Sequence, residues 1–249
     1  MTRVGSVGFG QISKRHLGIM AMVVGASALL LIAGCSVPAS GETDDEADAV
    51  QVSVANERDE DTLQAEPEPT IQERLDASFG TFDPITESGN GDAVVSLPSA
   101  SGAVIEVKYT GDRNFVVWTL DDGNEERDLL VNTVGSYEGN AAYFDDGATQ
   151  LKVSANGSWT IVVSPLSAAP MMTGNDSGRG DSVLLYDTEA ARWDFTHNGA
   201  RNFIVYRLVP GDLELLVNTI GVYEGTVPVT AAAGVVTIQA DGDWTLTAN

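Results

Sequence analysis

The sequence predicts an all-β protein in which two tandem β-sandwich or jelly-roll-like domains follow a signal peptide and a disordered acidic linker. Three observations lead to this fold class. An apolar N-terminal run ends at the only cysteine of the chain, an acid-rich stretch follows it, and the remainder is an internal repeat. Within that repeat, apolar and polar residues alternate with a period of two, as in strands that are buried on one face.

Residues 1–34 have the pattern of a signal peptide, because Lys14 and Arg15 precede an apolar run from Leu17 to Ala33. The junction Ile32-Ala33-Gly34-Cys35 resembles the lipobox of bacterial lipoproteins. The resemblance implies cleavage before Cys35 and a diacylglyceryl group on its thiol, which would hold the protein at the outer face of the cell membrane. Two alternatives stay open. The run of 17 residues is at the lower limit for an uncleaved membrane anchor, and ordinary secretion would leave Cys35 unmodified.

Residues 35–85 form an acidic segment. From Ser36 to Pro84 there are 14 acids and two bases, with no sustained hydrophobic period. Such a stretch cannot bury enough apolar surface to offset its conformational entropy, so residues 36–69 are predicted to be a disordered tether. Thr70 and Glu73 have the spacing of a capping box. They predict a short helix over 71–79 that docks on the first domain.

An internal duplication organises the rest of the chain. Residues 129–139 and 215–225 differ at only two of eleven positions, and the flanking turns and tryptophans also correspond. The repeats span 86–165 and 176–249, with a linker at 166–175. They form either separate domains or one sandwich with a shared core. The repeat resembles modules of uncharacterised exported bacterial proteins, a resemblance that implies no activity.

Each repeat is predicted to contain about seven short strands and no helix, the spacing of a sandwich or jelly roll. The run Phe115–Leu120 is apolar on both faces at its start, as expected for a strand inside a sheet. Asn156-Gly157 and Asp241-Gly242 lie between predicted strands and favour type I′ hairpin turns with positive φ.

The aromatic residues divide into two groups. Those alike in both copies are expected in the core, namely Trp159 with Trp244 and Trp118 with Tyr206. Those that differ between the copies are better candidates for an exposed platform that stacks on a sugar ring, although variation within the core explains the differences equally well. The candidates for this ligand surface are Tyr143, Phe144, Tyr186 and Trp193.

Reactive side chains are scarce beyond the signal segment. His197 is the only histidine there and takes the place of Tyr109, so a core or rim position is favoured over a catalytic base. Arg179-Gly180-Asp181 spells the tripeptide that integrins bind. Its counterpart Asn90-Gly91-Asp92 indicates a turn of the module instead.

Two acidic runs, at 121–126 and 145–147, are candidates for calcium binding. Neither has the ligand spacing of an EF-hand loop, so solvated turns are favoured. The sequence predicts no catalytic residue, no cofactor and no metal site.

The function expected from these features is a non-catalytic binding or scaffolding role at the cell envelope. The lipid would attach the protein to the membrane, and the ligand would be an envelope polysaccharide or protein. The formal net charge of −23 argues against nucleic acid, because phosphate binding requires clustered lysine and arginine. The alternatives are an extracytoplasmic hydrolase that uses loop carboxylates or a serine, and a passive spacer or stalk.

Overall fold

The structure is a computed structural model that describes residues 68–209 and 212–249. The signal segment and residues 36–67 of the predicted tether lie outside these ranges. Within the described residues, no helix has both the length and the apolar character needed to span a membrane.

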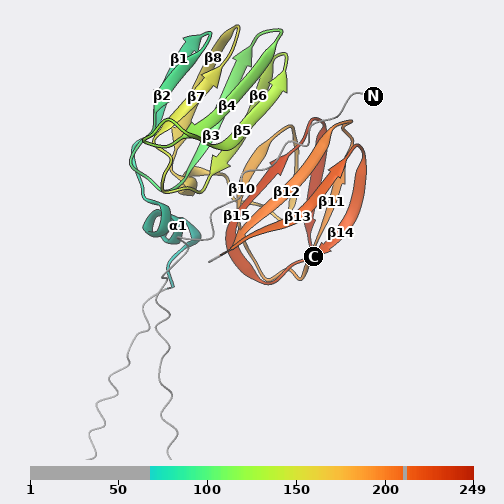
Figure 1. Ribbon diagram of the computed structural model, residues 1–249. Helices are drawn as coiled ribbons and strands as arrows, with labels where there is room; N and C mark the ends of the chain where they lie inside the picture. The colour runs from blue at the N-terminus through green and yellow to red at the C-terminus, as the bar shows by residue number, and fades with distance from the viewer. Residues whose placement is uncertain (1–67, 210–211) are drawn as a thin grey trace, which may run out of the picture. The chain divides into compact units, whose positions relative to one another are not determined.

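The described chain is almost entirely β-structure, as the alternating pattern predicts (Figure 1). It contains two four-stranded antiparallel sheets for each repeat. The strands of the first repeat are β1 (Ile85–Asn90), β2 (Ala93–Ser96), β3 (Ala103–Thr110), β4 (Asn114–Leu120), β5 (Glu126–Val134), β6 (Tyr137–Tyr143), β7 (Gln150–Ser154) and β8 (Ser158–Ser164). The strands of the second repeat are β9 (Asn175–Arg179), β10 (Ser182–Thr188), β11 (Arg192–His197), β12 (Asn202–Val209), β13 (Asp212–Ile220), β14 (Tyr223–Pro228), β15 (Ala232–Gln239) and β16 (Asp243–Ala248).

Both repeats have the same strand order. The sheets of the first repeat are β1-β8-β3-β6 and β2-β7-β4-β5, and those of the second are β14-β11-β16-β9 and β10-β15-β12-β13. Eight strands in two such sheets, with strands far apart in sequence as neighbours, make a jelly roll. The structure therefore consists of two tandem β-sandwich domains of one topology, which confirms the predicted fold class.

The structure has one more strand per repeat than expected. Two of the strands, β1 and β9, are largely polar and lack the hydrophobic alternation used for prediction. Both lie at sheet edges and pair with β8 and β16. Gly89 and Gly178 explain the pairing, because each leaves the space in which Trp159 or Trp244 packs on the edge strand. An ideal Cβ on Gly89 would lie 2.7 Å from Cε2 of Trp159, and on Gly178 2.8 Å from Cε2 of Trp244.

The predicted type I′ hairpins at Asn156-Gly157 and Asp241-Gly242 are wrong. The strands on either side of each turn belong to different sheets, so the chain crosses from one layer of the sandwich to the other. Positive φ occurs instead at Gly91 and Gly180, in the turns after β1 and β9. A crossing between layers does not need the tight mirror-image turn that joins paired strands.

Each repeat has its own hydrophobic core between its two sheets, which answers whether the repeats share one core. Trp159 and Trp244 lie in these cores, as predicted, with 4% and 3% of their surfaces exposed. Trp118 and Tyr206 do not. They are half-buried, since alternation along β4 and β12 turns them away from the inward-facing Phe115 and Phe203.

The predicted helix is present as α1 (Ile71–Phe79), and its capping box joins Thr70 to Glu73. The helix contacts the first repeat, as predicted, through Phe79 and Phe144, and it also packs on the second repeat. Ile71 and Leu75 join a third apolar cluster with the short helix η1 (Leu166–Ala168) and with residues of β10, β12 and β15. Sheet β10-β15-β12-β13 carries apolar residues on both faces, so its outer face requires a cover, and α1 with η1 supplies it.

Candidate functional site

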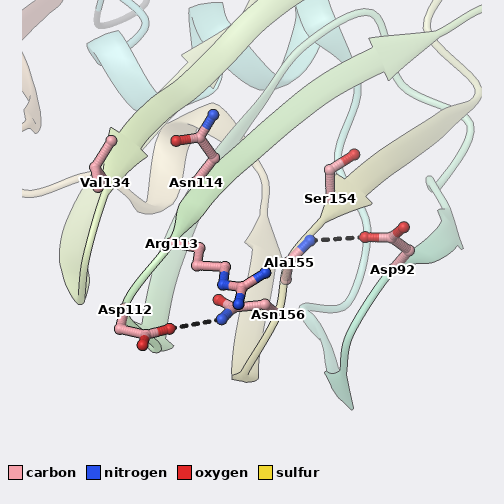
Figure 2. A pocket seen from close by; sticks show the side chains of 8 residues that line it. All are labelled: Asp92, Asp112, Arg113, Asn114, Val134, Ser154, Ala155 and Asn156. Atoms are coloured by element: carbon pink, nitrogen blue, oxygen red, sulfur yellow. Dashed lines mark hydrogen bonds between the residues drawn. The ribbon is translucent and has the colours of Figure 1, made fainter.

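A polar pocket lies at one loop end of the first jelly roll (Figure 2). It has a volume of about 600 Å³ and is open to solvent. Four segments supply its lining: the turn after β1, the turn after β3, the end of β5 and the crossing between β7 and β8. The lining residues are Asp92, Asp112, Arg113, Asn114, Val134, Ser154, Ala155 and Asn156.

Hydrogen bonds between these turns position the polar groups. The backbone N–H of Ala155 donates to Oδ1 of Asp92 at 2.9 Å, and Nδ2 of Asn156 donates to Oδ1 of Asp112 at 2.7 Å. The hydroxyl of Tyr109 donates to Oδ1 of Asn156 from the core side. In Figure 2, Arg113 extends toward Ala155 and Asn156, and it forms no ion pair with any residue that the structure describes.

This arrangement presents one guanidinium, two carboxylates, two amides and one hydroxyl on a solvent-open surface. Such groups form hydrogen bonds with hydroxyls, amides or charged groups of a ligand, and Arg113 is suited to a planar acceptor such as a carboxylate. The pocket is the candidate binding surface of the first repeat.

The corresponding surface of the second repeat has a different environment. Asp181, the counterpart of Asp92, accepts a hydrogen bond from Ala240 N–H at 2.8 Å, and its Oδ2 accepts one from the Tyr137 hydroxyl of the first repeat at 2.7 Å. Burial raises the pKa of the Asp181 carboxyl, although both hydrogen bonds act in the opposite direction. Burial also raises the pKa of Tyr137, with the charge of Asp181 and their hydrogen bond adding to the shift. The first repeat therefore covers Asp181 of the second repeat, whereas its own Asp92 is open to solvent.

The residues predicted to form an exposed aromatic platform do not form one. Tyr143, Tyr186 and Trp193 have 1%, 0% and 0% of their surfaces exposed, so none of them can stack on a ligand from solvent. Phe144 is half-buried and packs edge-on against Phe79 of α1, with 6.0 Å between ring centroids. The differences between the repeats at these positions are core variation. Burial, with the nearby Asp145 as a second cause, raises the pKa of Tyr143 to about 12.

His197 occupies a core position, as favoured from the sequence. It is 2% exposed and stacks on Phe203 with 4.6 Å between ring centroids, just as Tyr109 stacks on Phe115 in the first repeat. Its Nδ1 lies 2.9 Å from the carbonyl oxygen of Gly221, and its Nε2 lies 3.5 Å from Oδ1 of Asp241. Burial alone would raise the pKa of Asp241, but the backbone N–H groups of Arg201 and Ala200 lower it below its usual value.

The Arg179-Gly180-Asp181 tripeptide is a turn of the module, in agreement with the favoured interpretation. Arg179 pairs with Asp243 at 3.1 Å, and Asp181 is engaged by Ala240 and Tyr137. The carboxylate that an adhesion receptor would need is therefore already bonded within the chain.

The acidic run 121–126 is also a turn. Oδ1 of Asp121 accepts hydrogen bonds from the backbone N–H groups of Gly123 and Glu125 at 2.9 and 3.0 Å. In the run 145–147, Asp145 pairs with Arg127. Among the described residues, no group of three or more histidine, cysteine or acidic side chains is arranged to hold a metal ion.

One residue that the sequence reasoning missed is Arg207, which is 1% exposed in the second core. Its Nε donates to Glu214 at 2.9 Å and its Nη1 to the carbonyl oxygen of Thr230 at 2.8 Å, while its guanidinium lies over Trp193 and Tyr186. A charged residue at an inward position of the apolar run 202–209 was the signal in the sequence.

The residues of the predicted lipidation site, Ile32, Ala33, Gly34 and Cys35, lie outside the described residues.

No protein-family model matches the sequence, and no curated protein matches it. Among solved structures, the chain is similar to a conserved protein of unknown function from Pseudomonas aeruginosa PAO1, with 9% identity over 66% of this chain and 76% of that one and a TM-score of 0.22. It is also similar to cAMP-bound PfPKA-R, with 8% identity over 72% of this chain and 79% of that one and a TM-score of 0.21.

Proposed function

We propose that this chain is a lipoprotein held at the outer face of a cell membrane, where its two jelly rolls have a non-catalytic binding or scaffolding role toward an envelope polysaccharide or protein. The observation that carries the proposal is the solitary Cys35 directly after Ala33 and Gly34 at the end of an apolar run. A thiol at that place can carry a diacylglyceryl group. Two acyl chains give lasting attachment, since each buried CH₂ contributes about 0.8 kcal/mol.

The folded part is consistent with presentation away from a membrane. Helix α1 begins at Ile71 and is packed against the second repeat, so the chain becomes part of a folded body soon after the acidic stretch. As a flexible coil, the 34 residues of 36–69 would span about 30 Å, and self-repulsion of their charges would extend them further.

Mass spectrometry of the native polypeptide tests the anchor. We expect a mature N-terminus at Cys35 whose mass includes a diacylglyceryl group. The matched variant Cys35→Ala keeps the apolar run and should carry no lipid. An unmodified thiol on the wild-type chain, or an N-terminus elsewhere, would overturn the anchor.

The pocket of the first repeat is the surface at which we place the ligand. Its polar groups belong to turns that hydrogen bonds already hold, so binding would need little ordering of the protein. Retention of the native protein on purified envelope polysaccharide and on envelope proteins measures the activity. Arg113→Ala should reduce retention at least about tenfold, because it removes a charged hydrogen-bond donor.

The duplication supplies a matched control for this experiment. Arg201 is the exposed counterpart of Arg113 in the second repeat, and Arg201→Ala should leave retention unchanged. If Arg113→Ala and Arg201→Ala reduced retention equally, the pocket would not be the ligand site. If the native protein were retained on no envelope fraction, the proposed binding role would be wrong.

A further inference from the structure

The two repeats meet in two places. One is the third apolar cluster, which includes Val104 and Ala142 of the first repeat. The other joins unlike surfaces. From the second repeat it uses the turn at Gly180 and Asp181, between β9 and β10. From the first repeat it uses β6, which is the edge strand of its sheet. The Tyr137 hydroxyl donates to Asp181 Oδ2 at 2.7 Å, and the backbone N–H of Asn140 donates to the carbonyl oxygen of Asp181 at 3.0 Å.

Close packing accompanies these hydrogen bonds. An ideal Cβ on Gly139 would lie 3.3 Å from the Cβ of Asp181, and one on Gly180 would lie 3.6 Å from the carbonyl oxygen of Glu138. The turn of one jelly roll thus rests directly on the edge strand of the other.

Because the repeats share one fold, each also carries the surface that the other uses. The first repeat has a turn of the same construction. Gly91 and Gly180 have φ of +86° and +71°, and each donates its N–H at 3.0 Å to a glycine carbonyl, that of Gly157 or Gly242.

The tryptophan and aspartate contacts of the two turns also match. Trp159 donates to the carbonyl oxygen of Gly91 at 2.9 Å, and Trp244 donates to that of Gly180 at 3.0 Å. Asp92 accepts from Ala155 N–H at 2.9 Å, the same bond that Asp181 makes with Ala240.

The second repeat has the corresponding edge strand. β14 lies at the edge of its sheet, as β6 does. Tyr223 takes the place of Tyr137. The ring centroids of Tyr223 and Phe203 are 5.7 Å apart, and those of Tyr137 and Phe115 in the first repeat are 6.2 Å apart. An ideal Cβ on Gly225 would lie 2.5 Å from the Tyr223 hydroxyl, and one on Gly139 would lie 2.7 Å from the Tyr137 hydroxyl. Each hydroxyl therefore lies over the glycine two residues further along its strand.

Both of these surfaces are open in the described structure. Oδ2 of Asp92 and the hydroxyl of Tyr223 form no hydrogen bond with any residue in 68–209 or 212–249. Thr226, the counterpart of Asn140, is exposed where Asn140 is half-buried.

We propose that a second copy of this chain docks the Gly91–Asp92 turn of its first repeat on strand β14 of the first copy, repeating between molecules the contact of turn and edge strand that the two repeats make within one molecule. A contact between unlike surfaces leaves one of each kind free at the ends of the assembly. It therefore extends head to tail rather than closing as a symmetric dimer. This assigns a partner to the scaffolding role proposed above, but it requires neither the lipid nor an envelope ligand.

Charge sets the conditions of assembly. The chain is strongly acidic, so long-range repulsion opposes association at low salt and is screened at high salt. The contact consists of one turn on one edge strand, and small interfaces are weak. We expect association at about 10 µM to 1 mM, strengthening as the ionic strength rises.

Sedimentation of the purified full chain in detergent tests the proposal. The chain carries Cys35→Ser, so that neither lipid nor native thiol contributes. We expect species that grow with concentration beyond dimers. Tyr223→Phe should weaken association at least about tenfold, because it removes a hydrogen bond to a carboxylate. Tyr206→Phe removes a hydroxyl from a different sheet and should have no effect. A monomer up to about 1 mM, a closed dimer, or equal behaviour of both variants would overturn the proposal.

The sedimentation experiment does not depend on lipidation, so its outcome is separate from that of the anchor.

Discussion

Replacing Gly89 with alanine should destabilise the first jelly roll by about 2–4 kcal/mol. The ideal Cβ would lie 2.7 Å from Cε2 of Trp159 and closer still to Cζ2, whereas ordinary contacts lie at 3.4–4 Å. The indole is 4% exposed and donates to the Gly91 carbonyl oxygen at 2.9 Å, so it cannot move without losing that bond. Overpacking a core costs about 1–3 kcal/mol, and a lost hydrogen bond adds about 1 kcal/mol.

Calorimetry and urea denaturation of the purified chain measure this effect, with an expected fall of about 10 °C or more in the transition of the first repeat. Gly123→Ala is the matched control, because the nearest atom to its Cβ is the Asp121 carboxylate at 3.3 Å. It should change stability by less than about 0.5 kcal/mol. In a Trp159→Leu background the smaller side chain removes the clash, so Gly89→Ala should cost less than about 0.5 kcal/mol there. The same cost in both backgrounds would refute the packing explanation.

Three further substitutions probe other parts of the fold. Leu75→Ala should cost about 2–4 kcal/mol in urea denaturation, because this α1 residue is 5% exposed in the third apolar cluster. Glu214→Ala should cost about 2 kcal/mol by the same measurement, since it leaves the buried Arg207 guanidinium without its carboxylate. Asp128→Asn should flatten the pH dependence of stability above pH 3.8, measured as the urea midpoint. Burial, and secondarily the charge of Asp145, raises the pKa of Asp128 above its usual 3.8, while Arg127 lowers it. The folded state therefore holds the Asp128 proton more tightly than the unfolded state does. The stability that this proton contributes is lost as the pH rises from 3.8 through the raised pKa.

Each of these predictions has an opposing outcome. Ser78 lies on the exposed side of α1, so Ser78→Ala should leave stability unchanged. If Leu75→Ala changed stability as little as Ser78→Ala, the helix would not be docked. The exposed Glu224→Ala is the control for Glu214→Ala, and similar costs would contradict a specific role of the Arg207 pair. An unchanged pH slope in Asp128→Asn would show that burial of this carboxyl does not contribute to stability.

The features predicted correctly are those that depend on local patterns. The capping box at Thr70 and Glu73 determines where α1 begins, since it satisfies backbone N–H groups of the first turn with side chains three residues apart. The period-two alternation in runs such as Ala103–Tyr109 determines strands, because successive side chains of a strand point to opposite faces. The duplication determines that whatever fold one copy takes, the other takes as well.

The predictions that failed concern what lies on the second face of a strand. Tyr143, Tyr186 and Trp193 were candidates for an exposed platform only because their types differ between the repeats, and all three are core residues. The predicted hairpins at Asn156-Gly157 and Asp241-Gly242 failed for a related reason, since turn residues do not show whether the next strand pairs with the last or enters the other sheet.

The sequence by itself thus determined the class of fold, the duplication, the start of the helix and the candidate lipid-bearing cysteine. Only the tertiary structure decided which sheet each strand joins, that each repeat has its own core, that α1 packs on the second repeat as well as the first, and that Asp181 is covered while Asp92 is open. The physical reason is that alternation records which side chains share a face, whereas burial and bonding of that face depend on packing partners from distant parts of the chain.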